Sequence, residues 1–242
     1  MNYVVAADAK DFLPTLADES VDLFLIDPPF YGISRDLWDN DWDNPSIYAA
    51  WLVDLCEIAR RKVKPDGSLI VFQPIGKHNE HPVFEIVVGI ERTWHFQNWI
   101  TWKKARSFGK TCNYPFGREE ILWFSASGKP KKLTFNEPFT DQRHKRPGKT
   151  EFKRVSNVWD DIELVFRPER SCRRPMPLIS RLVRTHSNPG DLVVDFFSGY
   201  GTTGIVAHYL KRRFLGCEQI EKDAEEANRR VAEALVVAKA SS

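Results

Sequence analysis

The stretch "VDLFLIDPPFYG", residues 21–32, constrains the fold more than any other part of the chain. Its apolar run, Leu23–Ile26, is typical of a β-strand that is buried on both faces. The prolines Pro28 and Pro29 cannot donate to a sheet ladder, so the strand has to stop there. The sequence therefore predicts that Asp27 and the ring after the prolines lie at the carboxyl end of a buried strand. Open α/β sheets bind their ligands at such ends.

Strand and helix patterns alternate along most of the remaining chain. Strands are predicted near residues 3–7, 21–26, 68–73, 96–102, 120–124, 192–196 and 214–218. Helices are predicted near residues 47–63, 82–91, 177–186, from 203 onward and 222–238. Ser46 is the expected N-cap of the first helix, and "KPDG", residues 64–67, is an expected turn. The alternation predicts an α/β protein with a doubly wound, mostly parallel sheet.

Charge is unevenly distributed, although the net charge of the 242 residues is only +2. Residues 1–102 contain 8 Lys and Arg against 16 Asp and Glu, whereas residues 103–184 contain 20 against 9. Aromatic residues such as Phe108, Tyr114 and Phe135 alternate with the cations of this basic segment. Phosphate-pairing cations among stacking rings favour contact with nucleic acid, while a solvated, loop-rich face is the plainer interpretation.

The composition also bears on the class of protein. No stretch approaches the roughly 20 apolar residues of a membrane span, and the N-terminus lacks a basic-then-apolar signal segment, so we expect a cytoplasmic protein. The four cysteines are widely spread and form no Cys-x-x-Cys pair. This spacing favours reduced thiols over disulfides or a zinc site. We expect no metal ion.

A second informative stretch is "DLVVDFFSGYGTTG", residues 191–204. A buried strand ends at Asp195, and Gly199 and Gly201 would let a ligand approach the backbone without interference from a Cβ atom. The helix that follows offers amide donors to an anion. Glu218 ends the next strand, where an acid can hold a ribose diol. The sequence thus predicts a ligand-binding loop, although glycines in such a turn are also structural in many folds.

Four segments, in this order, resemble amino-group DNA methyltransferases of the group in which the catalytic Asp-Pro-Pro-Tyr/Phe segment precedes the cofactor glycine loop. The segments are "DESVDLFLIDPPFYG", "RRPMPLISRLVRTHSNPGD", "LVVDFFSGYGTTG" and "RRFLGCEQIEKDAEEANRR". The chain differs in having Phe196 where proline is usual and Arg174-Pro175 in place of Lys-Pro. The resemblance implies a Rossmann-like catalytic and cofactor-binding domain of residues 1–104 and 173–242. Residues 105–172 are then a basic insertion for DNA recognition.

The resemblance implies methyl transfer from S-adenosyl-L-methionine (AdoMet) to the amino nitrogen of a base flipped out of double-stranded DNA. Asp27 would accept one amino hydrogen and the Pro28 carbonyl the other, which aims the nitrogen lone pair at the methyl group. Asp27 would also stabilise the positive charge that develops on nitrogen during direct in-line attack. Pro29 completes the rigid turn, and Phe30 would stack on the base.

Further contacts follow from the resemblance and from the basic segment. Glu218 would hold the ribose hydroxyls, and Asp8 would lie near the adenine ring of the cofactor. The expected cofactor-binding residues are Asp8, Asp27, Asp195, Phe197, Ser198, Gly199, Gly201, Thr202, Thr203 and Glu218. The expected DNA-binding residues are Lys103, Lys104, Arg106, Arg118, Arg143, Lys145, Arg146, Arg173 and Arg174. Which arginine reads a base edge and which binds phosphate stays open.

The target base is predicted from one residue. In the resembled family an aspartate at the first catalytic position leans toward adenine N6 and a serine toward cytosine N4, so Asp27 favours adenine. Methylation of cytosine N4, or of adenine in RNA, is the alternative within the family. A homodimer is expected by analogy with related enzymes, and a cognate restriction enzyme is a further expected partner.

Two other classes of protein stay open at this stage. Gly199, Gly201 and Gly204 satisfy the GxGxxG spacing of nicotinamide-dependent oxidoreductases. That class leaves the Asp27–Phe30 segment and the basic segment without a role. A DNA-binding protein on an inactive methylase fold is the other alternative.

Overall fold

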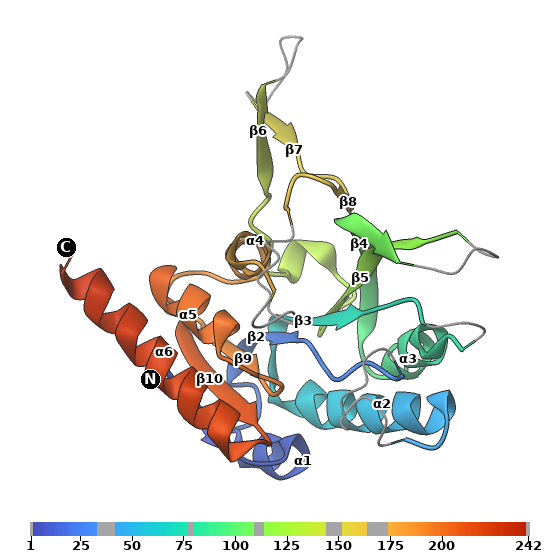
Figure 1. Ribbon diagram of the computed structural model, residues 1–242, viewed down its shortest axis with the longest axis horizontal. Helices are drawn as coiled ribbons and strands as arrows, with labels where there is room; N and C mark the ends of the chain where they lie inside the picture. Colours follow the sequence, from blue (N-terminus) through green and yellow to red (C-terminus); the bar gives the residue numbers. More distant parts are fainter. Residues whose placement is uncertain are drawn as a thin grey trace.

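The structure is a computed structural model that describes residues 2–32, 42–76, 80–108, 114–143, 152–163 and 174–240. Within these residues, an eight-stranded sheet has the strand order β1-β10-β9-β2-β3-β5-β4-β8 (Figure 1). Two further strands, β6 and β7, pair only with each other. The protein is therefore an α/β protein with one dominant sheet, as the alternation of sequence patterns predicts.

Five adjacent strands of the sheet run parallel. They are β1 (Asn2–Ala6), β10 (Arg213–Glu218), β9 (Leu192–Asp195), β2 (Val21–Ile26) and β3 (Val63–Gln73). All six residues of β2 are buried, because helices cover both faces of a parallel sheet. Since the strands run in one direction, their carboxyl ends meet at one edge of the sheet.

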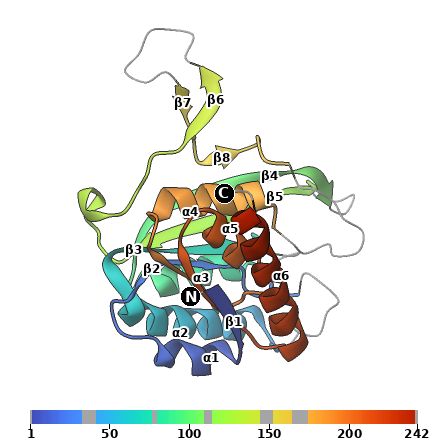
Figure 2. The ribbon, with the colours of Figure 1, turned by 90° about the vertical axis from the view of Figure 1, so that its left-hand side faces the viewer.

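The sheet continues beyond β3 with β5 (Phe116–Ser125), β4 (His95–Phe108) and β8 (Val158–Trp159). Strand β5 is antiparallel to both β3 and β4, and β8 is parallel to β4. Strands β5 and β8 lie within the range 105–172, so part of that range is built into the main sheet. The pair β6 (Phe139–Arg143) and β7 (Phe152–Arg154) projects away from the sheet in both views (Figures 1 and 2).

Helices cover the two faces of the sheet (Figure 2). One face holds α1 (Ala9–Phe12), α2 (Pro45–Lys62) and α3 (Pro82–Ile90), and the other holds α4 (Met176–His186), α5 (Thr202–Tyr209) and α6 (Glu221–Ala240). The short 3₁₀ helices are η1 (Leu13–Thr15) and η3 (Pro130–Lys132). Strand β2 serves both layers, because Phe24 and Ile26 pack on the first and Leu23 and Leu25 on the second.

Two features of the described residues bear on the class of protein. No helix among them is long and apolar enough to cross a membrane. The cysteines in this part of the chain, Cys56 and Cys217, are buried free thiols.

Two local predictions were wrong. Helix α2 is capped by Asn44 and not by Ser46: the Asn44 side-chain oxygen accepts a hydrogen bond of 2.9 Å from the amide of Ile47. Residues 64–67 do not form a separate turn but belong to β3, where the register with β2 shifts between Val21 and Leu23. Both differences arise because the sequence pattern locates an element better than it locates its ends.

Gly204 of α5 shows how closely this helix packs on the sheet. A Cβ atom at this position would lie 2.6 Å and 2.7 Å from two ring carbons of Phe214 in β10. The G204A variant is therefore expected to lose about 1–3 kcal/mol of unfolding free energy, although alanine is the better helix former by up to about 1 kcal/mol. Urea denaturation measures this loss. An equally stable variant would contradict the close packing of α5 on β10.

Candidate active site

Four acidic residues lie at the carboxyl ends of the parallel strands. Asp8 follows β1, Asp27 follows β2, Asp195 ends β9 and Glu218 ends β10. Strands β2 and β9 are neighbours, but the chain continues from β2 to β3 on one side and from β9 to β10 on the other. This is the point of a doubly wound sheet at which the strand order reverses and ligands bind. The two motifs that the sequence singled out therefore share one edge.

Aromatic rings connect the loop after β2 with the loop after β9. Tyr31 lies 6.0 Å from Tyr48 of α2, Tyr48 lies 5.9 Å from Trp51, and Trp51 lies 5.5 Å from Phe197, measured between ring centroids. Trp42 contacts both Tyr48 and Trp51 at 4.8 Å. The rings form one wall along the edge at which both loops lie.

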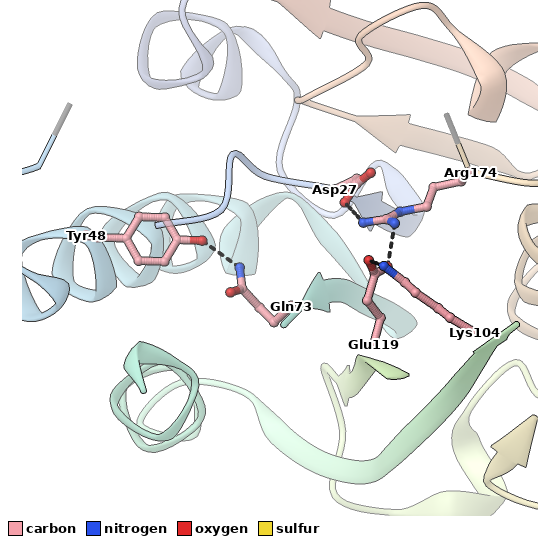
Figure 3. A network of polar contacts seen from close by, with 6 residues as sticks. All are labelled: Asp27, Tyr48, Gln73, Lys104, Glu119 and Arg174. Carbon is pink, nitrogen blue, oxygen red and sulfur yellow. Dashed lines mark hydrogen bonds and ion pairs between the residues drawn. The ribbon is translucent and has the colours of Figure 1, made fainter. Parts of the chain in front are cut away.

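Asp27 is the terminal member of a charged network (Figure 3). Arg174 Nη2 donates to Asp27 Oδ1 over 2.7 Å, and Arg174 Nη1 donates to Glu119 of β5. Glu119 also accepts from Lys104 of β4. Burial raises the pKa of Asp27, while the Arg174 guanidinium opposes that rise. The ionisation of Asp27 is thus set by the balance of burial and one direct cationic partner.

The same guanidinium contacts the ring that was expected to stack on a base. The guanidinium carbon of Arg174 lies 5.3 Å from the ring centroid of Phe30 and 5.0 Å from that of Phe72 in β3. Both distances suit cation–π contacts. Arg174 and Lys104, which the sequence assigned to DNA contact, therefore lie in the network of Asp27.

Glu119 belongs to this network but was not predicted from the sequence. Its side chain is 7% exposed and lies inside the sheet, on a strand that was recognised by its aromatic residues alone. The predicted strand began at residue 120, so Glu119 fell just outside it; the available signal was the neighbouring Glu120, because an acidic residue in a predicted buried strand requires a cationic partner. The sequence could not identify the partner of Glu119, since Arg174 is 55 residues away in the chain.

The glycine loop after β9 is held by Asp195, which is itself buried. One carboxylate oxygen of Asp195 accepts from the amide of Phe197 over 3.0 Å, and the other accepts from the hydroxyl of Thr203 over 2.7 Å. The Ser198 hydroxyl donates to the Asp195 carbonyl over 2.8 Å. Burial raises the pKa of Asp195 to about 7, against the effect of these hydrogen bonds.

Glu218 holds the same loop from the neighbouring strand. Its carboxylate accepts from the amides of Gly199 at 2.8 Å and Ile220 at 3.1 Å, and burial raises its pKa. Gly199 and Gly201 have φ angles of 47° and 73°, so the turn needs left-handed residues and suits glycine. Gly201 is the N-cap of α5, which starts at Thr202.

The residues of this loop fit an adenosine-type cofactor. A carboxylate has about four lone-pair sites. Glu218 accepts from the amides of Gly199 and Ile220, with a further contribution from the Gln219 amide, which leaves acceptor capacity for a ribose hydroxyl. Asp8 lies two residues beyond β1, whose last residue Ala6 pairs with Glu218. Its side chain caps α1 by accepting from the Lys10 amide over 2.7 Å.

The expected DNA-binding residues are spread over the basic segment. Lys103 and Arg118 are paired on β4 and β5; Lys103 is exposed, and Arg118 forms an ion pair of 2.9 Å with Glu120. Arg106 and Arg143 lie in β4 and β6, respectively. The positions Lys145, Arg146 and Arg173 lie outside the described residues. In the part of the chain that the structure describes, no three His, Cys, Asp or Glu side chains could together hold a metal ion.

Known proteins resemble this chain over nearly its whole length. A family model described as "DNA methylase" matches residues 21–229. The Type II methyltransferase M1.MboII of Moraxella bovis is 31% identical and aligns over 94% of this chain and 95% of its own length.

Solved structures agree with this match. TTHA0409, a putative DNA modification methylase from Thermus thermophilus that has also been solved in complex with S-adenosyl-L-methionine, is 26% identical. It superposes with a TM-score of 0.69 over 97% of this chain and 95% of the other. The cytosine-N4-specific PvuII DNA methyltransferase has a TM-score of 0.71 at 17% identity over 97% and 91%.

The fold is that of the Rossmann-like methyltransferases. The chain belongs to the amino-group DNA methyltransferase family, in which the methylated atom is adenine N6 or cytosine N4. This assignment leaves no basis for a nicotinamide-dependent oxidoreductase. The third glycine of that pattern, Gly204, packs against the ring of Phe214.

The raised pKa of Asp195 predicts a pH-dependent stability. Its pKa is about 7 in the folded protein, against 3.8 ordinarily, so the folded state binds more protons between these values and unfolding free energy falls as pH rises through them. The D195N variant removes this titration. Its stability relative to the wild type should rise from pH 5 to pH 7, by up to about 1.4 kcal/mol per pH unit.

Urea denaturation at pH 5, 6, 7 and 8 measures this difference. D161N is a matched control, because the Arg181 partner lowers the pKa of Asp161 and this residue stays ionised across the range. The difference between D161N and the wild type should show no trend over these pH values. A flat difference for D195N would contradict the protonation of Asp195 near neutral pH.

Proposed function

We propose that the protein is an AdoMet-dependent DNA methyltransferase that modifies adenine N6 within a specific duplex sequence. The observation that carries this proposal is that the Asp27 segment and the Asp195–Thr203 loop follow adjacent parallel strands, at the switch point of the sheet. This arrangement would bring a base-binding carboxylate and a cofactor loop together for direct transfer. The match to DNA methylases over residues 21–229 supports the methylation of DNA, on adenine N6 or cytosine N4.

The cofactor site consists of the residues of the two loops and of β10. Asp195, Phe197, Ser198, Gly199, Gly201, Thr202 and Thr203 would surround the methionine part, Glu218 the ribose and Asp8 the adenine. Bound AdoMet supplies an electrophilic methyl group on a cationic sulfur. Burial disfavours the ionised forms of Asp195 and Glu218, and a cation bound at this edge would favour them, so the acids suit such a ligand.

The chain's own residues orient and activate the target amine. The Asp27 carboxylate accepts one amino hydrogen, and the carbonyl of Pro28, held by the rigid ring, accepts the other. These bonds disfavour delocalisation of the nitrogen lone pair into the base, and the carboxylate stabilises the charge that develops on nitrogen. Pro29 keeps the turn rigid, and the Phe30 ring stacks on the flipped base.

Adenine is favoured over cytosine because an aspartate occupies the first catalytic position. The cytosine-N4-specific PvuII enzyme has the same fold, so the fold does not discriminate between the two bases. Cytosine N4 is therefore the second candidate target. The names of the Type II relatives support a role in restriction and modification, in which a cognate restriction enzyme would recognise the same sequence.

Recognition of DNA is assigned to the basic segment, residues 105–172, together with adjoining cations such as Lys103. The β6–β7 hairpin supports this assignment, because it extends away from the sheet and contains Lys153 and Arg154 (Figure 1). A projecting basic hairpin suits the groove and phosphates of a duplex.

The reaction is tested by incubating the protein with duplex DNA of diverse sequence and labelled AdoMet, followed by nucleoside mass spectrometry. We expect N6-methyladenine. The D27A variant should lose at least about 100-fold in kcat, because the acceptor of the amino hydrogen and the charge stabilisation are both removed. Its affinity for DNA should change little.

Two outcomes would count against the proposal. N4-methylcytosine as the product would move the assignment to the second candidate. No methylated nucleoside in DNA or RNA would remove the proposed function altogether, and full activity of D27A would remove the proposed mechanism.

Lys103 allows a test of the DNA-binding face that does not involve turnover. Its exposed ammonium is expected to pair with a phosphate, so K103Q should weaken binding to all sequences. The slope of log Kd against log salt should decrease by about 0.9, the value for one lost phosphate contact. K222Q, which makes the same charge change on an exposed residue of α6, is the control and should leave the slope unchanged. Equal effects of the two substitutions would contradict the assignment.

A further inference from the structure

Four side chains of alternating charge form a line that ends at Asp27 (Figure 3). Lys104 of β4 contacts Glu119 of β5, Glu119 contacts Arg174, and Arg174 contacts Asp27 over 2.7 Å. The side chains of Arg174 and Glu119 are only 12% and 7% exposed, respectively. The line therefore joins a largely buried ion network to the carboxylate at the reaction centre.

The guanidinium of Arg174 is held at several points at once. Its two terminal nitrogens bond different carboxylates, one from Asp27 and one from Glu119, and its plane lies near the rings of Phe30 and Phe72. A planar fork can make these contacts together, whereas the ammonium of a lysine is a single point charge. The choice of Arg at this position, where the resembled family has Lys, fits a contact to two acids.

This arrangement favours a fixed Arg174 over one that leaves to bind DNA. If the guanidinium moved away, Asp27 and Glu119 would both lose a cationic partner in a site where burial already raises the pKa of Asp27. Breaking a buried pair by removing one member is strongly unfavourable, because a charge is left uncompensated. Arg174 is therefore part of the site itself.

Charged groups from several elements face Asp27. Among the described residues these are Arg174, Glu119 and Lys104 from the network and Asp195 from the end of β9. The two acids oppose ionisation of Asp27 and the two cations favour it. Arg174 is the cation in direct contact, and Asp27 can stabilise the positive charge that develops on the amine only as the carboxylate.

We propose that Arg174 and Glu119 are positioning residues for methyl transfer: Arg174 orients the Asp27 carboxylate and keeps it ionised, and Glu119, anchored by Lys104, holds Arg174 in place. The inference rests on the proposed function, in which Asp27 accepts a hydrogen of the target amine. With Oδ1 bonded to Arg174, the second oxygen of Asp27 is oriented toward the amine. Phe30, which contacts the same guanidinium, is the proposed platform for the base.

The test compares the wild-type protein with R174Q, R174K and E119Q. The first readout is the titration of Asp27 itself, followed by ¹³C NMR of protein labelled at the aspartate carboxyl carbons, with D27N identifying the signal. The second readout is single-turnover methyl transfer to duplex DNA from pH 5.5 to pH 9. Melting temperatures show which variants are folded. If R174Q is unfolded, R174K is the variant that tests the role of Arg174.

Loss of the arginine should raise the titration midpoint of Asp27 by about 1–3 pH units, the usual effect of one adjacent cation. Because the carboxylate then forms only at higher pH, the transfer rate of R174Q should fall at least 10-fold at pH 6.5 and recover as pH rises. R174K should have an intermediate titration midpoint and transfer rate, since lysine keeps the positive charge but lacks the two terminal nitrogens of the guanidinium. The Kd for DNA should stay within about twofold, whereas a DNA-reading arginine would change the Kd and leave the titration unchanged.

E119Q separates positioning from plain electrostatics. Removing the negative charge of Glu119 by itself would lower the midpoint of Asp27 and leave the rate unchanged or higher. If Glu119 holds Arg174, the rate of methyl transfer should instead fall several-fold at every pH. The low-pH side of the pH–rate profile should not shift to higher pH. An E119Q variant with wild-type rates would overturn the role of Glu119.

R181Q is the matched control for the arginine variants. Arg181 of α4 also bonds a carboxylate through two nitrogens, to Asp161 at 2.9 Å and 2.6 Å, and lies 4.9 Å from the ring centroid of Trp159. It has no contact with Asp27 among the described interactions, so its removal should leave the titration and the rate profile unchanged.

The outcomes distinguish this inference from the proposed function. An unchanged Asp27 titration in R174Q overturns the inference, whether or not the wild type methylates DNA. A wild type without methyl transfer overturns the proposed function, and the carboxyl titration then still reports whether Arg174 controls the ionisation of Asp27.

Discussion

The parallel pairing of β2 with β9 is the constraint on which the candidate site depends. Leu23 pairs with Val193 and Phe24 with Val194, although the two strands are separated by most of the chain. This register brings Asp27 and the Asp195 loop to the same edge, with neighbouring strands continuing in opposite directions. A different neighbour for β2 would leave each motif intact but separate Asp27 from the Asp195 loop.

Burial disfavours the ionised forms of the acids at this edge of the sheet. Burial raises the pKa values of Asp27, Asp195 and Glu218, and each acid has partners that oppose the effect. Backbone amides and a hydroxyl serve Asp195 and Glu218, whereas Asp27 has a guanidinium. The difference suits their proposed roles. A cationic ligand can offset the burial of Asp195 and Glu218, whereas the proposed substrate of Asp27 is a neutral amine, so Asp27 has to be ionised before the amine binds.

The departures from the resembled family have structural explanations. Phe196, where proline is usual, is buried and meets the ring of Phe24 edge-on at 5.8 Å, so it extends the core beneath the glycine loop. Arg174, where lysine is usual, bridges two carboxylates. Each substitution gains contacts that depend on the shape of the new side chain and not on its hydrophobicity or charge alone.

The sequence by itself determined the elements and the chemistry carried on them. The strand that ends at Asp27, the strand that ends at Asp195 and the glycine turn were predictable, because burial, proline and glycine act on neighbouring residues. The full extent of β3, the N-cap of α2 and the incorporation of β5 into the main sheet were not. Only the tertiary structure decided that Arg174 and Glu119 meet Asp27, since these residues come from three separate segments and no local pattern records which buried charges will be paired.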